Sequence, residues 1–148
     1  MQKNGFTLIE LICVIAIIAI ATSIAMPNIS NWLDKEALNT SARQIAVGIR
    51  KTRQLAMTTN RETKFELYRD GKYKIRDYDV RRPSLETVEL SKRVNYISSN
   101  FNDNFYNIDV VGFNVRGRPT YGGTITLRAN KEELNITVLP VTGRVKIK

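Results

Sequence analysis

The chain lacks histidine and has a single cysteine, and these two gaps exclude several classes of protein. Without a second cysteine it cannot form an internal disulfide. Without histidine it has neither a Cys/His metal site nor a histidine-based catalytic centre. Cys13 lies within an apolar run, where a lone cysteine is expected to serve as a small apolar side chain. We therefore expect no cofactor and no bound metal.

Charge is almost absent from the first 26 residues, in which only Lys3 and Glu10 are charged. As a helix, residues 6–26 would be about 31 Å long, which matches a hydrocarbon core of about 30 Å. A carboxylate at the bilayer centre costs roughly 2.5–3.5 kcal/mol, so Glu10 points to a function. The segment is also compatible with a secretory signal peptide cleaved after Ala25, which would release a soluble binding domain, although an acidic residue has no use there.

Residues 5–11 read GFTLIEL and follow a short basic leader. This string resembles the N-terminus of type IV pilins and pseudopilins. The resemblance implies that a prepilin peptidase cuts between Gly5 and Phe6, removes residues 1–5 and methylates the Phe6 amine. It further implies a retained helix over residues 6–26. Before assembly this helix would cross the inner membrane once, with residues 27–148 in the periplasm or outside, and afterwards it would lie in a filament core.

The cut would place a new amine on Phe6, four residues before Glu10. That amine is cationic, so Glu10 can pair with it within one helix turn or across to a neighbouring subunit. Glu10 near a helix N-terminus is also favoured by the helix dipole. The resemblance favours the intersubunit pair, in which Glu10 fixes register during assembly. Pro27, where the family commonly has a proline, is expected to kink the helix without ending it.

The rest of the chain predicts an α+β fold, pilin-like, in which a long N-terminal helix packs on an antiparallel β-sheet domain. Between residues 28 and about 60, apolar side chains recur with helical spacing. These are Leu38, Ala42, Ile45, Ile49 and Ala56. A basic flank is expected on the same helix, formed by Lys35, Arg43, Arg50, Arg53, Arg61 and Lys64. Short strands between residues 64 and 148 should form one sheet, with a hairpin turn at Asp70-Gly71 and a loop over residues 98–107.

Residues in the C-terminal half resemble one subfamily in particular. Residues 122–127 (GGTITL) and 143–147 (GRVKI), together with the helix around residues 41–56, resemble the GspH/FimT subfamily of minor pilins and pseudopilins. This implies a structural subunit of a type II secretion pseudopilus, and not an enzyme. The implied partners are other pilins in a filament, the prepilin peptidase/methyltransferase and inner membrane lipid. The alternative is a FimT-like minor pilin that binds DNA for uptake.

The C-terminal tail alternates cations with apolar residues. On a strand, Arg144, Lys146 and Lys148 would share one face at a spacing of about 6.7 Å, which suits a phosphate backbone. Some members of the subfamily bind DNA through a Gly-Arg-x-Arg tail. Here Lys146 replaces the second arginine and loses the bidentate fork. The simpler interpretation is an edge strand that lysines protect from aggregation.

Two groups of acidic and amide residues are weaker candidates for a functional site. An oxygen-rich stretch could bind calcium, but it lacks the spacing of a calcium loop, and a surface loop is the better interpretation. It comprises Asn100, Asn102, Asp103, Asn104 and Asp109. Asp77 and Asp79 could act as paired carboxylates, but nearby arginines make charge balance the better explanation. Nucleophile motifs and phosphate-binding loops were not found in the sequence.

Overall fold

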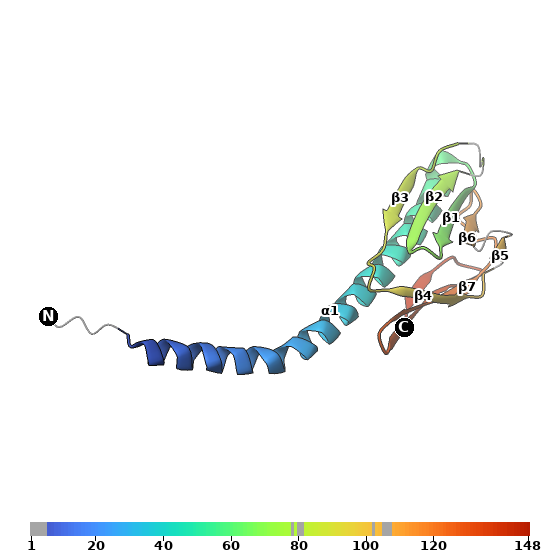
Figure 1. Ribbon diagram of the computed structural model, residues 1–148. Helices are drawn as coiled ribbons and strands as arrows, with labels where there is room; N and C mark the ends of the chain where they lie inside the picture. The colour runs from blue at the N-terminus through green and yellow to red at the C-terminus, as the bar shows by residue number, and fades with distance from the viewer. Residues whose placement is uncertain (1–5, 78, 80–81, 102, 105–107) are drawn as a thin grey trace. The chain divides into compact units, whose positions relative to one another are not determined.

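The computed structural model describes residues 6–77, 79, 82–101, 103–104 and 108–148. The chain divides into two compact units, Met1–Leu33 and Asp34–Lys148. Among the described residues, a single helix, α1 (Leu8–Thr59), belongs to both units, and nine strands follow it (Figure 1). α1 continues through Pro27, so this proline does not end the helix. The predicted kink stays a prediction.

The second half of α1 is held to its unit by an apolar stripe. All five residues of the predicted stripe are at most 2 % exposed. Asn60 ends the helix with a left-handed conformation, φ 51°, and the Arg61 N–H then donates to the Ala56 carbonyl at 3.3 Å. This geometry is a common helix C-terminus, because it satisfies one of the last free carbonyl groups.

The larger sheet has five antiparallel strands in the order β3-β2-β1-β6-β5. They are β1 (Thr63–Tyr68), β2 (Lys72–Asp77), β3 (Glu86–Glu89), β5 (Asp103–Asn104) and β6 (Ile108–Phe113). The predicted hairpin at Asp70-Gly71 joins β1 to β2. Gly71 has φ 79°, a conformation that glycine adopts without the steric cost of a side chain. Successive β1 residues alternate between buried and half-buried, as expected for a strand with one face on the core.

The smaller sheet has four antiparallel strands in the order β4-β7-β8-β9. They are β4 (Asn95–Ser99), β7 (Gly123–Ala129), β8 (Glu132–Val138) and β9 (Val145–Ile147). β9 is therefore an edge strand, and within the described residues it pairs only with β8. The helix and both sheets share one core, to which each contributes buried apolar side chains.

Close contact between helix and sheet is possible because Gly48 has no side chain. A Cβ atom at this position would lie 2.8 Å from the Tyr73 ring and 2.9 Å from the Phe65 ring. The two rings pack on each other with centroids 4.9 Å apart. Glycine at this turn of α1 thus sets how closely the helix approaches the larger sheet.

Three sequence predictions about the second unit were wrong. The strands form two sheets, not one, because alternation identifies strands without revealing which strands pair. The predicted loop over residues 98–107 contains the end of β4 and the two-residue β5, while residues 102 and 105–107 lie outside the described residues. Arg61 and Lys64 are not on the helix flank, because α1 ends at Thr59 and Lys64 lies in β1.

Candidate functional site

The first candidate site is the start of α1, where Phe6 and Glu10 were predicted to act. The Phe6 side chain is 89 % exposed, and the first turn of the helix leaves Glu10 exposed as well. Gly5, the predicted cleavage residue, lies outside the described residues. Across the part of the chain that is described, no helical stretch combines the length and the hydropathy of a membrane span.

Glu10 is bound within its own helix by Thr7. Its carboxylate accepts hydrogen bonds from the Thr7 N–H at 3.3 Å and from the Thr7 hydroxyl at 3.2 Å. In return, the Glu10 N–H donates to the Thr7 hydroxyl oxygen at 3.3 Å. These reciprocal contacts form a capping box, which satisfies N–H groups that the first turn of a helix leaves free.

Thr7 was not among the predicted site residues, although the sequence contains the signal for it. The pattern Thr-x-x-Glu immediately before an apolar run is the usual signature of a capping box. The consequence is that Glu10 has two hydrogen-bonding options. Its carboxylate either caps its own helix through Thr7 or binds a cation on another molecule, and an exposed position permits the exchange.

The second candidate site is the basic tail, which the structure places at the free edge of the smaller sheet. Arg144, Lys146 and Lys148 are all exposed, whereas Val145 is partly buried against the core. The predicted alternation of cations and apolar residues is therefore present. Ile147 departs from it slightly, since 37 % of its surface is exposed.

Two other basic segments lie beside the tail, α1 and the loop around Gly117, whose carbonyl oxygen would be 3.4 Å from a Cβ atom at Gly143. From α1, the Arg50 guanidinium donates to the Val145 carbonyl at 3.4 Å. Arg53 donates to the Gly117 carbonyl at 2.9 Å, which ties the helix to the loop between β6 and β7. Gly117 has φ 71°, and its neighbours Arg116 and Arg118 are exposed. The helix, this loop and the tail therefore bring their arginines to one region of the unit.

These segments share a feature that the sequence analysis overlooked, a complete lack of acidic residues. Residues 37–61, 110–131 and 134–148 hold twelve Lys and Arg and no Asp or Glu. Among the described side chains, ion pairs involve only three of these twelve cations, Lys51, Arg61 and Arg128. The exposed cations of the tail and of the β6–β7 loop thus form no ion pair with the described side chains of the unit. We call Arg116, Arg118, Arg144, Lys146 and Lys148 the basic cluster.

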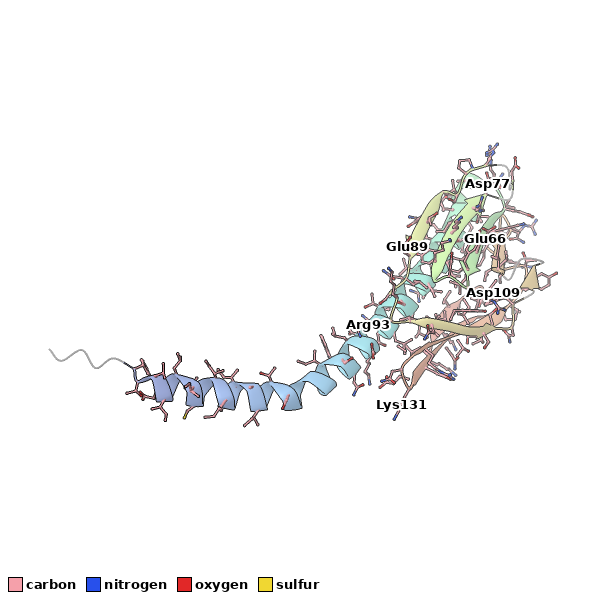
Figure 2. All side chains as sticks on the ribbon, in the orientation of Figure 1. Glu66, Asp77, Glu89, Arg93, Asp109 and Lys131 are labelled. Atoms are coloured by element: carbon pink, nitrogen blue, oxygen red, sulfur yellow. The ribbon has the colours of Figure 1, made fainter. Side chains whose placement is uncertain are left out.

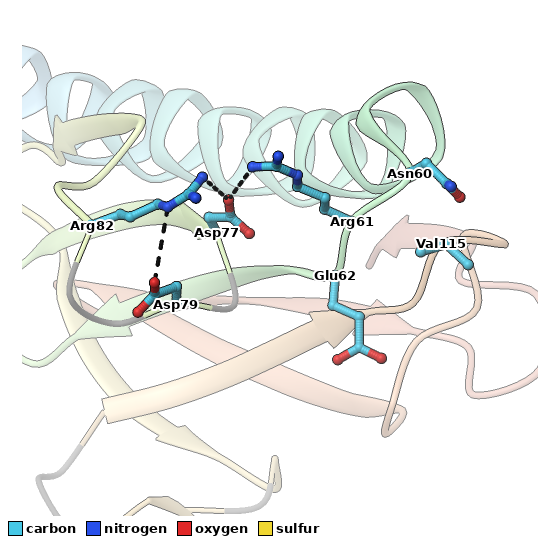
Figure 3. A pocket seen from close by; sticks show the side chains of 7 residues that line it. All are labelled: Asn60, Arg61, Glu62, Asp77, Asp79, Arg82 and Val115. Carbon is cyan, nitrogen blue, oxygen red and sulfur yellow. Dashed lines mark hydrogen bonds and ion pairs between the residues drawn. The ribbon is translucent and has the colours of Figure 1, made fainter.

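The acidic residues that the sequence singled out have structural partners instead. Figure 3 shows Asp77 between Arg61 at 3.5 Å and Arg82 at 3.3 Å, while Asp79 lies 3.9 Å from Arg82. The two carboxylates are therefore charge-balanced, as expected. The Arg61–Asp77 pair ties the segment that follows α1 to the end of β2.

Asp109, labelled in Figure 2, is only 6 % exposed and accepts hydrogen bonds from the hydroxyls of Tyr96 and Ser99. These bonds link β6 of the larger sheet to β4 of the smaller one. Burial, followed by the bond to Asp109, raises the pKa of Tyr96 to about 12. Within the described ranges, no three His, Cys, Asp or Glu side chains gather as a metal site would require.

Three comparisons relate the chain to known proteins. Residues 1–26 match the family described as the prokaryotic N-terminal methylation motif. The competence protein ComGD of Bacillus subtilis is 26% identical over 99% of this chain and 94% of its own length. The type IV minor pilin FimU of Pseudomonas aeruginosa superposes with a TM-score of 0.63 at 10% identity, over 79% of this chain and 92% of FimU. The chain therefore has a pilin-like fold, and it is similar to ComGD over nearly its whole length.

A pilin-like fold is also found in the minor pseudopilin EpsH from the type 2 secretion system of Vibrio cholerae. EpsH superposes with a TM-score of 0.59 at 8% identity, over 75% of this chain and 95% of EpsH. The fold class predicted from the sequence is therefore confirmed. FimU is described as a minor pilin and EpsH as a minor pseudopilin, and neither description is that of an enzyme.

Proposed function

We propose that this pilin-like chain is a minor subunit of a type IV-like filament, processed between Gly5 and Phe6 and assembled through Glu10. The observation that carries the proposal is the N-terminal methylation motif over residues 1–26, in which Glu10 is the only acidic residue. Before assembly, residues 6–26 hold the chain in the inner membrane as a single span, with the second unit outside. In the filament, the Glu10 carboxylate leaves Thr7 and pairs with the methylated Phe6 amine of a neighbour.

The filament that uses this subunit is proposed to belong to a competence machine. ComGD, which matches nearly the whole chain, is named a competence protein, and this favours competence over the secretion pseudopilus expected from the sequence. Deleting the gene should reduce transformation by added DNA and leave the secreted proteins in the medium unchanged. The reverse result would assign the subunit to secretion.

The assembly role of Glu10 is tested by separating its charge from its capping function. Glutamine retains an oxygen that can accept hydrogen bonds from Thr7, but it cannot form an ion pair. If the carboxylate pairs with a neighbour's amine, Glu10→Gln and Glu10→Ala should both be processed normally and remain in the membrane, yet fail to enter filaments. Incorporation is measured by crosslinking to partner pilins and by recovery in sheared filaments.

Thr7→Ser serves as the matched control, because serine keeps the hydroxyl that caps the helix. It should assemble like the wild-type chain. If Glu10→Gln assembles normally while Glu10→Ala does not, capping by itself explains the requirement, and the ion pair plays no part in assembly.

A second candidate function, contact with DNA, is favoured by the basic cluster. Its cations are exposed and lack ion-pair partners within the described part of the unit, so they are available to phosphates. Binding through so few contacts should be weak and independent of sequence, with a dissociation constant of about a micromolar or poorer at physiological salt. Such contact would suit a filament that captures DNA at the cell surface.

The measurement is the salt dependence of duplex DNA binding by the full-length chain in detergent. Each phosphate contact contributes about 0.9 to the slope of log affinity against log salt. Changing Arg144 and Lys146 together to alanine should therefore flatten the slope by roughly two units. Arg69 and Lys92, exposed cations outside the cluster, provide a control pair with the same charge change. An equal effect of the control pair, or no binding by the wild type at low salt, would reject DNA contact.

A further inference from the structure

The free edge of the smaller sheet is formed by β9. In the sheet order β4-β7-β8-β9 this strand has a neighbour on one side alone. Edge strands leave a row of N–H and C=O groups without partners, and such a row can accept another strand. β9 can therefore accept another strand through the backbone groups that face away from β8.

The hydrogen bonds to β8 identify the backbone groups that point outward. Lys148 and Asn135 exchange both of their bonds, at 2.9 and 2.8 Å, and the Leu139 N–H donates to the Arg144 carbonyl at 3.0 Å. Bonded and non-bonded pairs alternate along an antiparallel ladder, so Lys146 also bonds to β8. Val145 and Ile147 occupy the non-bonded positions, opposite Val138 and Ile136. Their N–H and C=O groups point to the open side of the strand.

A side chain, not a strand, meets this edge in the described structure. The Arg50 guanidinium of α1 donates to the outward carbonyl of Val145, at the long distance of 3.4 Å. Lys146 and Lys148 flank the outward groups of Ile147. The 37 % exposure of the Ile147 side chain adds apolar surface at the same place. The edge thus offers hydrogen-bonding groups, a hydrophobic contact and uncompensated positive charge.

We propose that this edge accepts an extended, acidic segment of a neighbouring filament subunit as a fifth strand of the smaller sheet. The proposal rests on the filament role proposed above. An added strand would bond to the outward groups of Val145 and Ile147, and its carboxylates would lie beside Arg50, Lys146 and Lys148. It would bring carboxylates to residues 134–148, which contain no Asp or Glu.

The same charges disfavour pairing of this edge with the same edge of a second copy. Two copies of β9 brought side by side would oppose lysine to lysine, and like charges across a strand pair are destabilising. Lysines on an edge therefore prevent self-association, while an acidic strand meets no such penalty. Charge thus selects the partner, and main-chain hydrogen bonds provide the docking geometry.

The test uses the full-length chain in detergent and an acetylated Glu-Val-Glu-Val-Glu peptide as the probe. Hydrogen exchange at the Val145 and Ile147 amides should slow when the peptide is added. Ile147→Pro removes one outward N–H and leaves the bonds between β8 and β9 in place, since proline is tolerated where a strand's N–H faces solvent. This substitution should weaken peptide binding up to about tenfold, the equivalent of one hydrogen bond. Ile147→Val keeps the N–H and should bind like the wild type.

Two further arms make the result decisive. Continued protection of the Asn135 amide, which bonds to Lys148, verifies that Ile147→Pro leaves the sheet intact. Lys146→Glu, which changes an exposed side chain, should weaken binding of the peptide while preserving the fold. The proposal is overturned if the two amides exchange equally with and without peptide, or if Ile147→Pro binds as well as the wild type. It is also overturned if duplex DNA binds the edge and the acidic peptide does not. Assembly of the Glu10 variants is scored separately, so failure here leaves the filament role standing.

Discussion

At the scale of single residues, two acidic side chains are stabilised by hydroxyl groups in contrasting surroundings. Glu10 is exposed and shares its hydrogen bonds with Thr7, so another partner can replace that residue. Asp109 is buried, and the hydroxyls of Tyr96 and Ser99 bind it. Removing a donor from a buried carboxylate is costly, because the lost hydrogen bond is not replaced by water. The first arrangement suits an exchange of partners, and the second suits permanent attachment of two sheets.

The Tyr96 hydroxyl should make stability depend on alkaline pH. Its pKa is raised from 10.0 to about 12, so the folded protein favours the neutral phenol. A raised pKa contributes stability that is complete below pH 10 and is lost as the pH rises to about 12. Tyr96→Phe should destabilise the second unit by about 1–3 kcal/mol at pH 8, because Asp109 then loses a donor. The difference from the wild type should shrink between pH 10 and 12.

Urea unfolding followed by circular dichroism measures this difference. Tyr121→Phe is the control, since Tyr121 is 52% exposed and removing its hydroxyl should change stability little. A Tyr96→Phe difference that stays constant from pH 8 to 12 would contradict the assigned role of the hydroxyl.

At the scale of elements, local patterns predicted the helix, most strands and the β1–β2 hairpin, but not how the other strands pair. The stripe from Leu38 to Ala56 and the turn at Gly71 follow from spacing and residue type alone. The division into two sheets depends on contacts between distant segments, such as Asp109 with Tyr96. A two-residue strand such as β5 is too short for any alternation to appear. The sequence predicted only the tail residues of the basic cluster. Arg116 and Arg118 belong to a distant segment, and the contact between Arg53 and Gly117, which holds that segment against α1, is visible only in the structure.

The packing of α1 on the larger sheet gives a prediction at Gly48. Alanine favours a helix over glycine by about 1 kcal/mol, but its Cβ would lie 2.8 Å from the Tyr73 ring. Overpacking of this kind costs about 1–3 kcal/mol, which exceeds the gain in helix propensity. Gly48→Ala should therefore lower the free energy of unfolding by about 1 kcal/mol. Gln54→Ala, at an exposed position of the same helix, should leave it unchanged or raise it. A Gly48→Ala variant more stable than the wild type in urea would show that the rings move aside freely.

At the scale of the whole molecule, many of the basic residues lie in segments that contain no acidic residue. The fold brings these segments together, away from most of the acidic side chains. All 14 acidic residues lie outside the three acid-free segments, which carry twelve cations of a chain whose net charge is +9. Ion pairs such as Arg76 with Glu66 and Arg82 with Asp77 use acids in and around the larger sheet. The uncompensated cations therefore collect near α1 and β9. In the filament role proposed above, a subunit with this distribution would meet a neighbour, or a polyanion, in a restricted set of orientations.

The proposed cleavage between Gly5 and Phe6 would decide whether the basic cluster is displayed on a filament. Mass spectrometry of the membrane-extracted protein should find a chain that begins at N-methylated Phe6. Gly5→Leu should leave the precursor uncut, because the resemblance places a small residue before the cut, and Ala25→Leu should change nothing. A signal peptide would give the opposite pattern, with cleavage before Met26 that Ala25→Leu blocks. Such a chain would have lost Glu10 together with the apolar run, so it could neither pair with a neighbour's amine nor hold its basic cluster at a filament surface.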